Sequence, residues 1–79
     1  MLEDLKNKEK TIGIKQTVKA VENRTAKFVY IAKDADDKVV NVLKELCKKN
    51  LIEVIYVENM KQLGKACGID VGAAAVSVL

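Results

Sequence analysis

The fold is decided by a stretch in the middle of the chain, residues 28–37, which reads FVYIAKDADD. Its first half is almost continuously apolar, as expected of a strand whose sheet is covered on both faces. Its second half supplies acidic residues that cap a helix and favour its first turn. The stretch therefore predicts a buried strand, Phe28–Ala32, followed closely by a helix that runs to about Lys49 and stops at Asn50.

The rest of the chain repeats this alternation of strands and helices. Alternating elements of this kind indicate an α/β domain built in layers, and 79 residues suffice for one small domain spanning residues 1–79. The other expected elements are a short helix over 2–9, an extended piece at 11–12, a helix from Gly13 to about Asn23, a strand over 52–57, a helix capped by Asn59 and ended by Gly68, and a strand over 73–79.

Apolar spacing predicts which helix faces are buried. In the helix that starts at Gly13, the expected stripe is Ile14, Val18 and Val21. In the helix that ends near Lys49, the expected apolar face is formed by Val39, Val40, Leu43, Leu46 and Cys47.

The composition excludes several function classes. No apolar run approaches the roughly 20 residues that a membrane span needs, and the acidic start Met1–Asp4 lacks a signal-peptide pattern, so we expect a cytoplasmic protein. Histidine is absent, and Cys47 and Cys67 form no CxxC pair, which predicts two buried thiols and neither a metal nor a cofactor. An enzyme is disfavoured because the usual acids, bases and nucleophiles are scarce.

The charge is unevenly distributed. Residues 5–33 contain eight lysines and arginines against two glutamates, whereas residues 34–58 contain four basic and six acidic residues. A basic half beside an acidic middle steers a polyanion toward one side of a protein. An ordinary solvated lysine surface explains the same numbers, so charge alone leaves both readings open.

A motif at the start of the helix at Gly13 carries groups suited to RNA. The first backbone N–H groups of a helix lack partners and the dipole is positive there, and Gly13 allows a close approach. Lys15 and Lys19 share one helix face although their charges repel. Gln16 beside them can hydrogen bond to purine edges, and lysine to guanine. A plain solvated face remains the alternative, because lysine and glutamine are good helix formers.

A second motif, LGKACGIDVG, occupies residues 63–72. It is no Walker phosphate-binding loop, because no Gly-Lys-Ser/Thr follows. Gly68 is typical of a helix end and Gly72 of a strand entrance, and between them Ile69 and Val71 flank Asp70 on a short loop. Aliphatic side chains exposed on a loop can stack under an unpaired base, or they can pack into the core. The sequence leaves both arrangements open.

Together the two motifs resemble those of the ribosomal protein L7Ae/L30e family of kink-turn RNA binders, and the chain is similar to its small bacterial members. The resemblance covers essentially the whole chain and is most specific over residues 13–19, 31–36 and 63–68, the last leading to residues 73–76. It implies a three-layer α-β-α sandwich with a mixed four-stranded sheet. It also implies a sharply bent RNA loop with tandem sheared G·A pairs as the ligand, ribosomal RNA or a riboswitch, bound by a monomer.

The same resemblance implies a role for each candidate residue. Guanines of the G·A pairs would face the start of the first long helix in the opened major groove, the loop at residues 69–71 would cover the nucleotide flipped out of the bulge, and Lys33 would touch the RNA backbone. The expected RNA-binding residues are Gly13, Lys15, Gln16, Lys19, Lys33, Ile69, Asp70 and Val71.

Two departures from the family pattern stand out. Archaeal and eukaryotic relatives usually carry Asn-Glu where this chain has Lys15-Gln16, so the motif here lacks a carboxylate acceptor and gains a charge. A proline often stands where this chain has Asp37, which concerns the helix start alone. A function of another class, a protein–protein adaptor without RNA that uses the helix face Val39–Cys47, is compatible with the same sequence.

Overall fold

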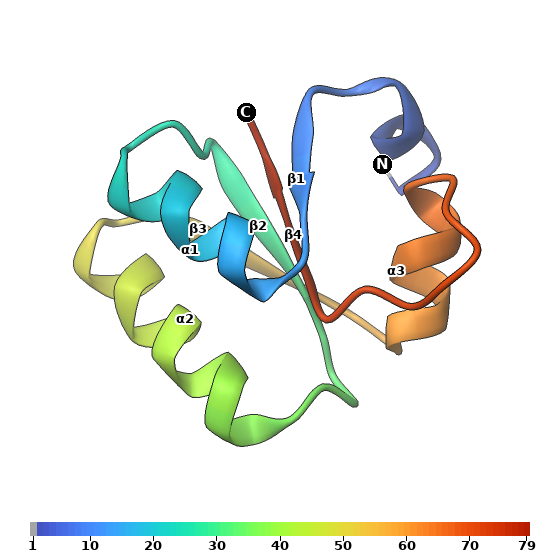
Figure 1. The fold of residues 1–79 in the computed structure, drawn as a ribbon. Helices are drawn as coiled ribbons and strands as arrows, with labels where there is room; N and C mark the ends of the chain where they lie inside the picture. Colours follow the sequence, from blue (N-terminus) through green and yellow to red (C-terminus); the bar gives the residue numbers. More distant parts are fainter. Residues whose placement is uncertain (1) are drawn as a thin grey trace.

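The computed structural model describes the backbone of residues 2–79 and the side chains of residues 5–79, so Met1 and the side chains of the acidic start Met1–Asp4 lie outside what it describes. Figure 1 shows the elements in the order expected from the sequence. They are the 3₁₀ helix η1 (Leu2–Asn7), β1 (Lys10–Ile12), α1 (Ile14–Glu22), β2 (Phe28–Ala32), α2 (Asp37–Lys49), β3 (Glu53–Val57), α3 (Met60–Ala66) and β4 (Ala75–Val78).

The strands form one mixed sheet of four strands in the order β1-β4-β2-β3. β2 and β3 run parallel, whereas β4 is antiparallel to both of its neighbours. The helices α1 and α2 cover one face of the sheet, and α3 with η1 covers the other (Figure 1). The expected three-layer α-β-α sandwich with a mixed four-stranded sheet is therefore confirmed.

The two central strands carry the core. Every residue of β4 is buried, and in β2 only Phe28 is partly exposed, as a strand covered on both faces requires. Cys47 and Cys67 are both buried free thiols, as predicted. No helix in the described part of the chain combines the length and the apolar character needed to cross a membrane.

The predicted buried face of α1 is wrong in part. The buried side chains are Thr17, Ala20 and Val21, whereas Ile14 and Val18 are only partly buried. The reason is a cluster of hydroxyls under the helix: Thr11 Oγ1 is hydrogen-bonded to Ser77 Oγ and lies 3.4 Å from Thr17 Oγ1. A buried hydroxyl needs a partner, and Thr11 of β1, itself bonded to Ser77 of β4, supplies one for Thr17.

Other elements differ from expectation at their margins. The first helix is a 3₁₀ turn that ends at Asn7, because only Leu5 among its described side chains is buried and the chain must enter β1 at Lys10. In α2, Val39 is 42% exposed and does not belong to the core. The last strand begins at Ala75, since the residues before it form part of a loop that packs on α3.

Each of the helices α1, α2 and α3 ends in the same way. The residue after the C-cap adopts a left-handed conformation: Arg24 and Leu51 at φ 59° and Gly68 at φ 80°. The next backbone N–H then bonds back to a carbonyl of the last helical turn, as in Ile69 N–H to Gly64 O at 3.1 Å. This is the Schellman arrangement. At the end of α3 it directs the chain into the loop over residues 69–72.

Candidate nucleic-acid interface

All three α-helices begin at one end of the sheet, which we call the helix-start end. This end consists of Gly13, residues 33–36, residues 58–60 and the loop 69–74. β1, β2 and β3 finish there and β4 begins there, at the bottom of Figure 1. Backbone hydrogen bonds join the parts: Gly13 N–H donates to Ala75 O at 2.8 Å and Ala32 N–H to Ala74 O at 2.9 Å. The two sequence motifs therefore meet at the same place.

The start of α1 is an open helix N-terminus. Its N-cap, Gly13, has φ 102° and ψ 158°, provides no side-chain cap, and is followed by a first turn without an acidic residue. A Cβ at Gly13 would meet nothing within 4 Å, so the glycine is needed for its conformation and faces free space. Lys15, Gln16 and Lys19 are exposed on this helix, as predicted. The result is a positive dipole end bordered by two lysines.

The loop over residues 69–72 is held tightly against α3. A Cβ atom on Gly64 would stand only 2.0 Å from the carbonyl oxygen of Val71. Gly72 lies against Met60. Ala73 N–H donates to Met60 O at 3.0 Å. Gly64 therefore permits a backbone-to-backbone contact that a side chain would block.

The two aliphatic side chains of the loop differ. Ile69 is partly buried and packs against the core, whereas Val71 is 70% exposed. Asp70 between them is also exposed. The sequence left open whether these side chains pack into the core or stay exposed. Ile69 does the first and Val71 the second, because the Schellman bond at Gly68 turns Ile69 inward. Val71 is the aliphatic side chain of this loop that remains available to a ligand.

Lys33 lies directly after β2, where its N–H donates to Val57 O at 2.8 Å. Its ammonium is 3.6 Å from a carboxylate oxygen of Glu58, and both side chains are more than half exposed. Such a surface pair contributes little to stability. Gly13 and Lys33 directly follow β1 and β2, the strands on either side of β4, so these two expected contact residues flank the start of β4.

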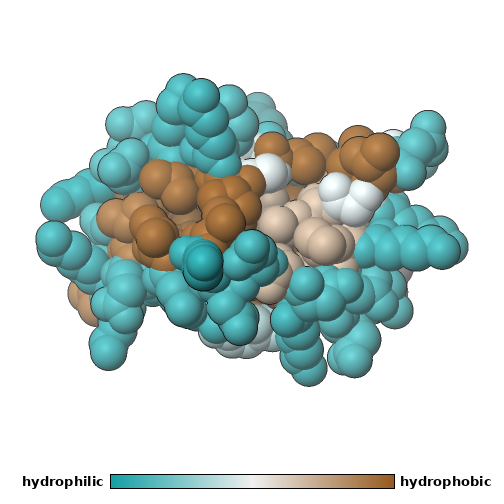
Figure 2. Space-filling view, turned by 60° about the horizontal axis from the view of Figure 1, so that its bottom comes forward, coloured by the Kyte–Doolittle hydropathy of each residue, from teal (hydrophilic) through white to brown (hydrophobic). Residues whose placement is uncertain are grey.

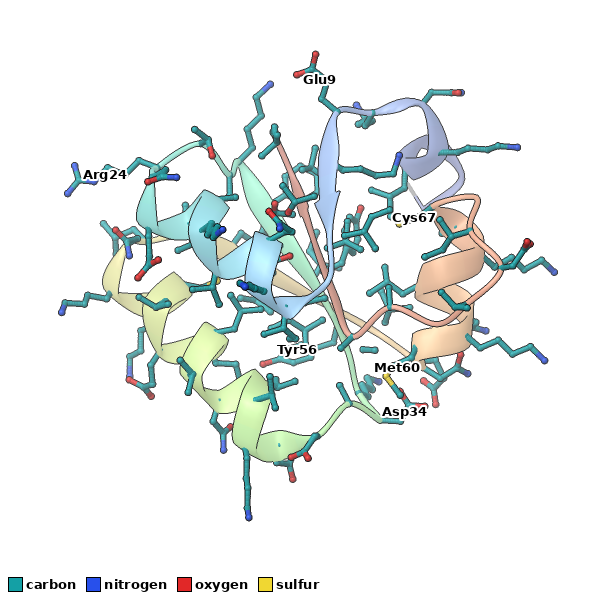
Figure 3. The ribbon with its side chains drawn as sticks, in the orientation of Figure 1. Glu9, Arg24, Asp34, Tyr56, Met60 and Cys67 are labelled. Carbon is teal, nitrogen blue, oxygen red and sulfur yellow. The ribbon has the colours of Figure 1, made fainter. Side chains whose placement is uncertain are left out.

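Asp34 has a role that the sequence does not reveal. Its carboxylate accepts a hydrogen bond from Met60 N–H at 2.8 Å, so it fastens the start of α3 across 26 residues, as Figure 3 shows. The expected cap of α2 is Asp36 alone, which accepts from Lys38 N–H at 2.9 Å. The signal for Asp34 was its place at a strand end, next to the parallel strand that leads into α3.

The surface of the helix-start end combines apolar and charged groups. Figure 2 shows this end brought forward, with an apolar band across it and polar side chains around the band. Its exposed large apolar side chains include Val71 and, in the first turn of α2, Val39. Ile14, Met60, Ile69 and Ala74 at the same end are partly buried.

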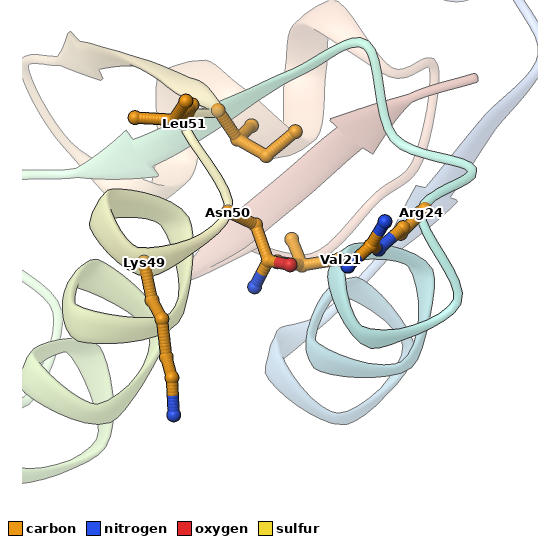
Figure 4. A pocket seen from close by; sticks show the side chains of 6 residues that line it. Val21, Arg24, Lys49, Asn50 and Leu51 are labelled. Carbon is orange, nitrogen blue, oxygen red and sulfur yellow. The ribbon is translucent and has the colours of Figure 1, made fainter.

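The opposite end of the molecule has a pocket between two helices. There the ends of α1 and α2 enclose a cavity of about 300 Å³ lined by Val21, Arg24 and residues 49–52 (Figure 4). Its side chains include neither a carboxylate nor a nucleophile. In the described residues no group of three His, Cys, Asp or Glu could hold a metal ion. Burial raises the pKa of the Cys47 and Cys67 thiols, and the charge of Lys10 partly offsets this rise at Cys67.

Known proteins share both the sequence and the fold. An RNA-binding protein of Caldanaerobacter subterraneus is 49% identical over 69 residues, which are 87% of this chain and 84% of that protein. An RNA-binding protein of Halalkalibacterium halodurans is 54% identical over 67 residues, covering 85% and 82% of the two chains. RNA-binding protein YbxF of Geobacillus stearothermophilus is 43% identical over 68 residues, covering 86% and 83%.

A solved structure, described as the 15.5kD RNA binding protein of Giardia lamblia, superposes with a TM-score of 0.88 at 25% identity, covering 98% of this chain and 68% of that one. A Bacillus halodurans protein described as of unknown function superposes with a TM-score of 0.89 at 28% identity, covering 98% and 81%. The model of the ribosomal protein L7Ae/L30e/S12e/Gadd45 family matches residues 2–79. With the fold, the two motifs and the relatives in agreement, this chain belongs to the ribosomal protein L7Ae/L30e/S12e/Gadd45 family.

Proposed function

We propose that this chain is an RNA-binding protein that holds a kink-turn RNA in its bent form and catalyses no reaction. The observation that carries the proposal is the meeting, at the helix-start end, of an uncapped helix N-terminus, exposed lysines and an exposed loop valine. The relatives named RNA-binding proteins, at 43% to 54% identity, support it.

The proposed contacts follow from where each group lies. Lys15, Gln16 and Lys19 on α1 present donors to guanine acceptors of the G·A pairs, and Gly13 keeps the approach to the first backbone N–H groups open. Val71 stacks under the flipped nucleotide, supported from behind by Ile69 and bordered by Asp70. Lys33 binds the RNA backbone after leaving Glu58.

The mechanism is a shift of a conformational equilibrium. A bent RNA crowds its phosphates and loses stacking, so it is a minor species without a partner. A protein that contacts only the bent form raises its population by as much as its preference for that form. Lysines provide salt-dependent affinity, while base contacts and the loop provide selectivity.

The test is a titration of a kink-turn RNA labelled at both ends with a fluorescent donor and acceptor. Wild-type protein should raise the energy-transfer efficiency between the two labels of this RNA. It should leave the transfer efficiency unchanged in an RNA whose G·A pairs are replaced by Watson–Crick pairs. Charge reversal in K15E/K19E should weaken binding more than K48E/K49E, a matched pair of exposed lysines at the far end of α2. Equal binding of both RNAs, or no bending, would overturn the proposal.

A second measurement addresses the loop. Val71→Ala should speed dissociation of the labelled RNA while leaving the fold intact, because Val71 is 70% exposed and contributes little to the core. An unchanged dissociation rate would remove Val71 from the interface.

The cellular setting belongs to the same proposal. We propose that the protein acts as a monomer in the cytoplasm, either on ribosomal RNA or as a regulator of a riboswitch-type RNA, since one surface serves both. Cosedimentation with ribosomal subunits at moderate salt distinguishes a ribosomal component from a regulator.

A protein–protein adaptor is the second candidate function. It is favoured by two apolar side chains on the outer side of α2, Val39 at 42% and Val42 at 59% exposed. Size-exclusion chromatography with light scattering tests it: a stable oligomer without RNA would favour the adaptor, and a monomer would favour RNA binding.

A further inference from the structure

Two helices of this protein carry the same short sequence on their exposed sides. α1 begins with IKQTVKA at residues 14–20, and α3 begins with MKQLGKA at residues 60–66. Both runs therefore read apolar-Lys-Gln-x-x-Lys-Ala from the first residue of a helix. Both helices also start at the helix-start end.

The lysines and the glutamine that match between the two helices are exposed and do not belong to the core. Lys61, Gln62 and Lys65 are exposed, just as Lys15, Gln16 and Lys19 are. At the position that is buried in both runs the residue types differ, Thr17 in α1 and Leu63 in α3, and among the matching residues Ala20 alone is buried. Identity confined largely to solvent-facing residues indicates a shared surface property rather than a shared packing requirement.

Helix stability does not explain the pair of lysines in α3, Lys61 and Lys65. Lys61 lies in the first turn, where the helix dipole disfavours a cation, and Lys65 follows one turn later on the same face. Of the acidic residues whose side chains are described, none forms an ion pair with either lysine. Within residues 5–79, therefore, neither ammonium group is engaged by a carboxylate.

The start of α3 is closed, in contrast to that of α1. Met60 N–H is bound by the Asp34 carboxylate at 2.8 Å, and Gln62 N–H by the Asn59 side chain at 2.7 Å. Its backbone N–H groups cannot approach a base or phosphate in the way that those of α1 can. What α3 offers is the lysine face along its side, which suits contact with phosphates rather than with base edges.

The loop 69–72 lies between the two lysine faces. It packs directly on α3 through Gly64 and Gly72 and leads into β4, which is bonded to Gly13 at the start of α1. The faces stand on opposite sides of the sheet, α1 in one helical layer and α3 in the other (Figure 1). An RNA folded back at the loop would send one stem toward each layer.

We propose that Lys61 and Lys65 form a second, backbone-binding surface for the bent RNA, which contacts phosphates of the stem that the α1 site does not read. This inference rests on the proposed function. It predicts that affinity grows with the length of one stem only, and that this growth depends on the α3 lysines.

The test uses a set of kink-turn RNAs in which either stem is lengthened in turn from a minimal duplex. The variant is K61Q/K65Q and its matched control is K48Q/K49Q, which removes the same charge from exposed lysines at the far end of α2. Binding is measured for each protein between 50 and 200 mM salt. Circular dichroism verifies that both variants remain folded.

Each phosphate contact contributes about 0.9 to the slope of log affinity against log salt on a duplex. Two lost contacts should therefore reduce the slope on the long-stem RNA by about 1.8, so that the same salt step weakens K61Q/K65Q roughly twelvefold less than wild type. The control should keep the wild-type slope on the long-stem RNA, and on the minimal RNA K61Q/K65Q should bind as wild type does.

Two results would overturn the inference. One is a wild-type slope for K61Q/K65Q on every RNA, and the other is an equal loss on the minimal and long-stem RNAs, which would assign the α3 lysines to the primary site. Failure of the proposed function is separate and is seen in the wild-type protein alone, as equal binding to RNAs with and without G·A pairs.

Discussion

Replacing Gly64 with alanine probes how firmly the loop over 69–72 is held against α3. A Cβ at this position would stand 2.0 Å from Val71 O, 3.0 Å from Val71 C and 3.1 Å from Gly72 Cα. All of these atoms belong to backbone, so no side chain can rotate away. Taking 3.4 Å as the lower limit of ordinary contact, the carbonyl oxygen must move at least 1.4 Å further away.

The expected loss of stability is the balance of two effects. Overpacking of a tight contact costs about 1–3 kcal/mol, while alanine in place of glycine within a helix gains about 1 kcal/mol. We expect Gly64→Ala to lower the free energy of unfolding by up to about 2 kcal/mol, which corresponds to a fall in Tm of up to roughly 15 °C for a domain of this size. Because Val71 shares the displaced backbone, dissociation of kink-turn RNA should also become severalfold faster.

Thermal unfolding followed by circular dichroism measures the first effect, and a stopped-flow chase of labelled RNA measures the second. Gln62→Ala, an exposed position on the same helix, serves as the control for helix propensity. A Gly64→Ala protein that melts at or above the wild-type Tm and releases RNA at the wild-type rate would refute the assigned contact between the loop and the helix.

Three further perturbations test other features of the structure. Leu51→Gly should raise stability by about 0.5–1 kcal/mol, because a left-handed leucine, here at φ 59°, is strained and 92% exposed; a lower Tm would contradict this. Glu58→Gln should change stability by less than about 0.5 kcal/mol yet tighten RNA binding by freeing Lys33, and weaker binding would exclude that lysine from the interface. Since burial raises the pKa of Cys47 and Cys67, the native thiols stay protonated where unfolded ones ionise. Stability should therefore fall as pH rises above about 8.5, and an equally steep fall in C47A/C67A would argue against the thiols as its source.

Local sequence signals predict the elements of this fold well. The strand Phe28–Ala32 matches its predicted bounds, because an unbroken apolar run followed by acidic capping residues has few other solutions. Asn59 caps α3 and Gly68 follows its end in a left-handed conformation, since both roles depend on neighbours within four residues.

Features that depend on distant partners escape such reasoning. Thr17 looks like a polar surface residue by its type, yet it is buried because Thr11 and Ser77, which are 66 residues apart, bring their hydroxyls beneath it. Asp34 looks like a cap for the helix that follows it, yet it binds Met60 26 residues later. Sheet topology decides both pairings, and no spacing along the chain encodes it directly.

The candidate site shows the same division. Exposure of Lys15, Gln16 and Lys19 follows from helical periodicity. The different burial of Ile69 and Val71 does not, because it is set by the Schellman bond at the end of α3 and by the contact between the loop and Gly64. Their roles toward RNA stay predictions, as do those of the other expected contact residues.

The caps of the three helices bear on which helix receives a ligand. Three positive dipole ends gather at the helix-start end, and two of them are already neutralised within the protein: α2 by Asp36 and Asp37, and α3 by Asp34 and Asn59. Only α1 begins with a glycine that supplies no side-chain cap, followed by a turn without acid. A helix that begins with an N-cap glycine lacks stabilisation of about a few tenths of a kcal/mol that a capping side chain would provide. An anionic ligand would supply the missing partner, so the least stabilised helix start is the one best suited to bind the RNA.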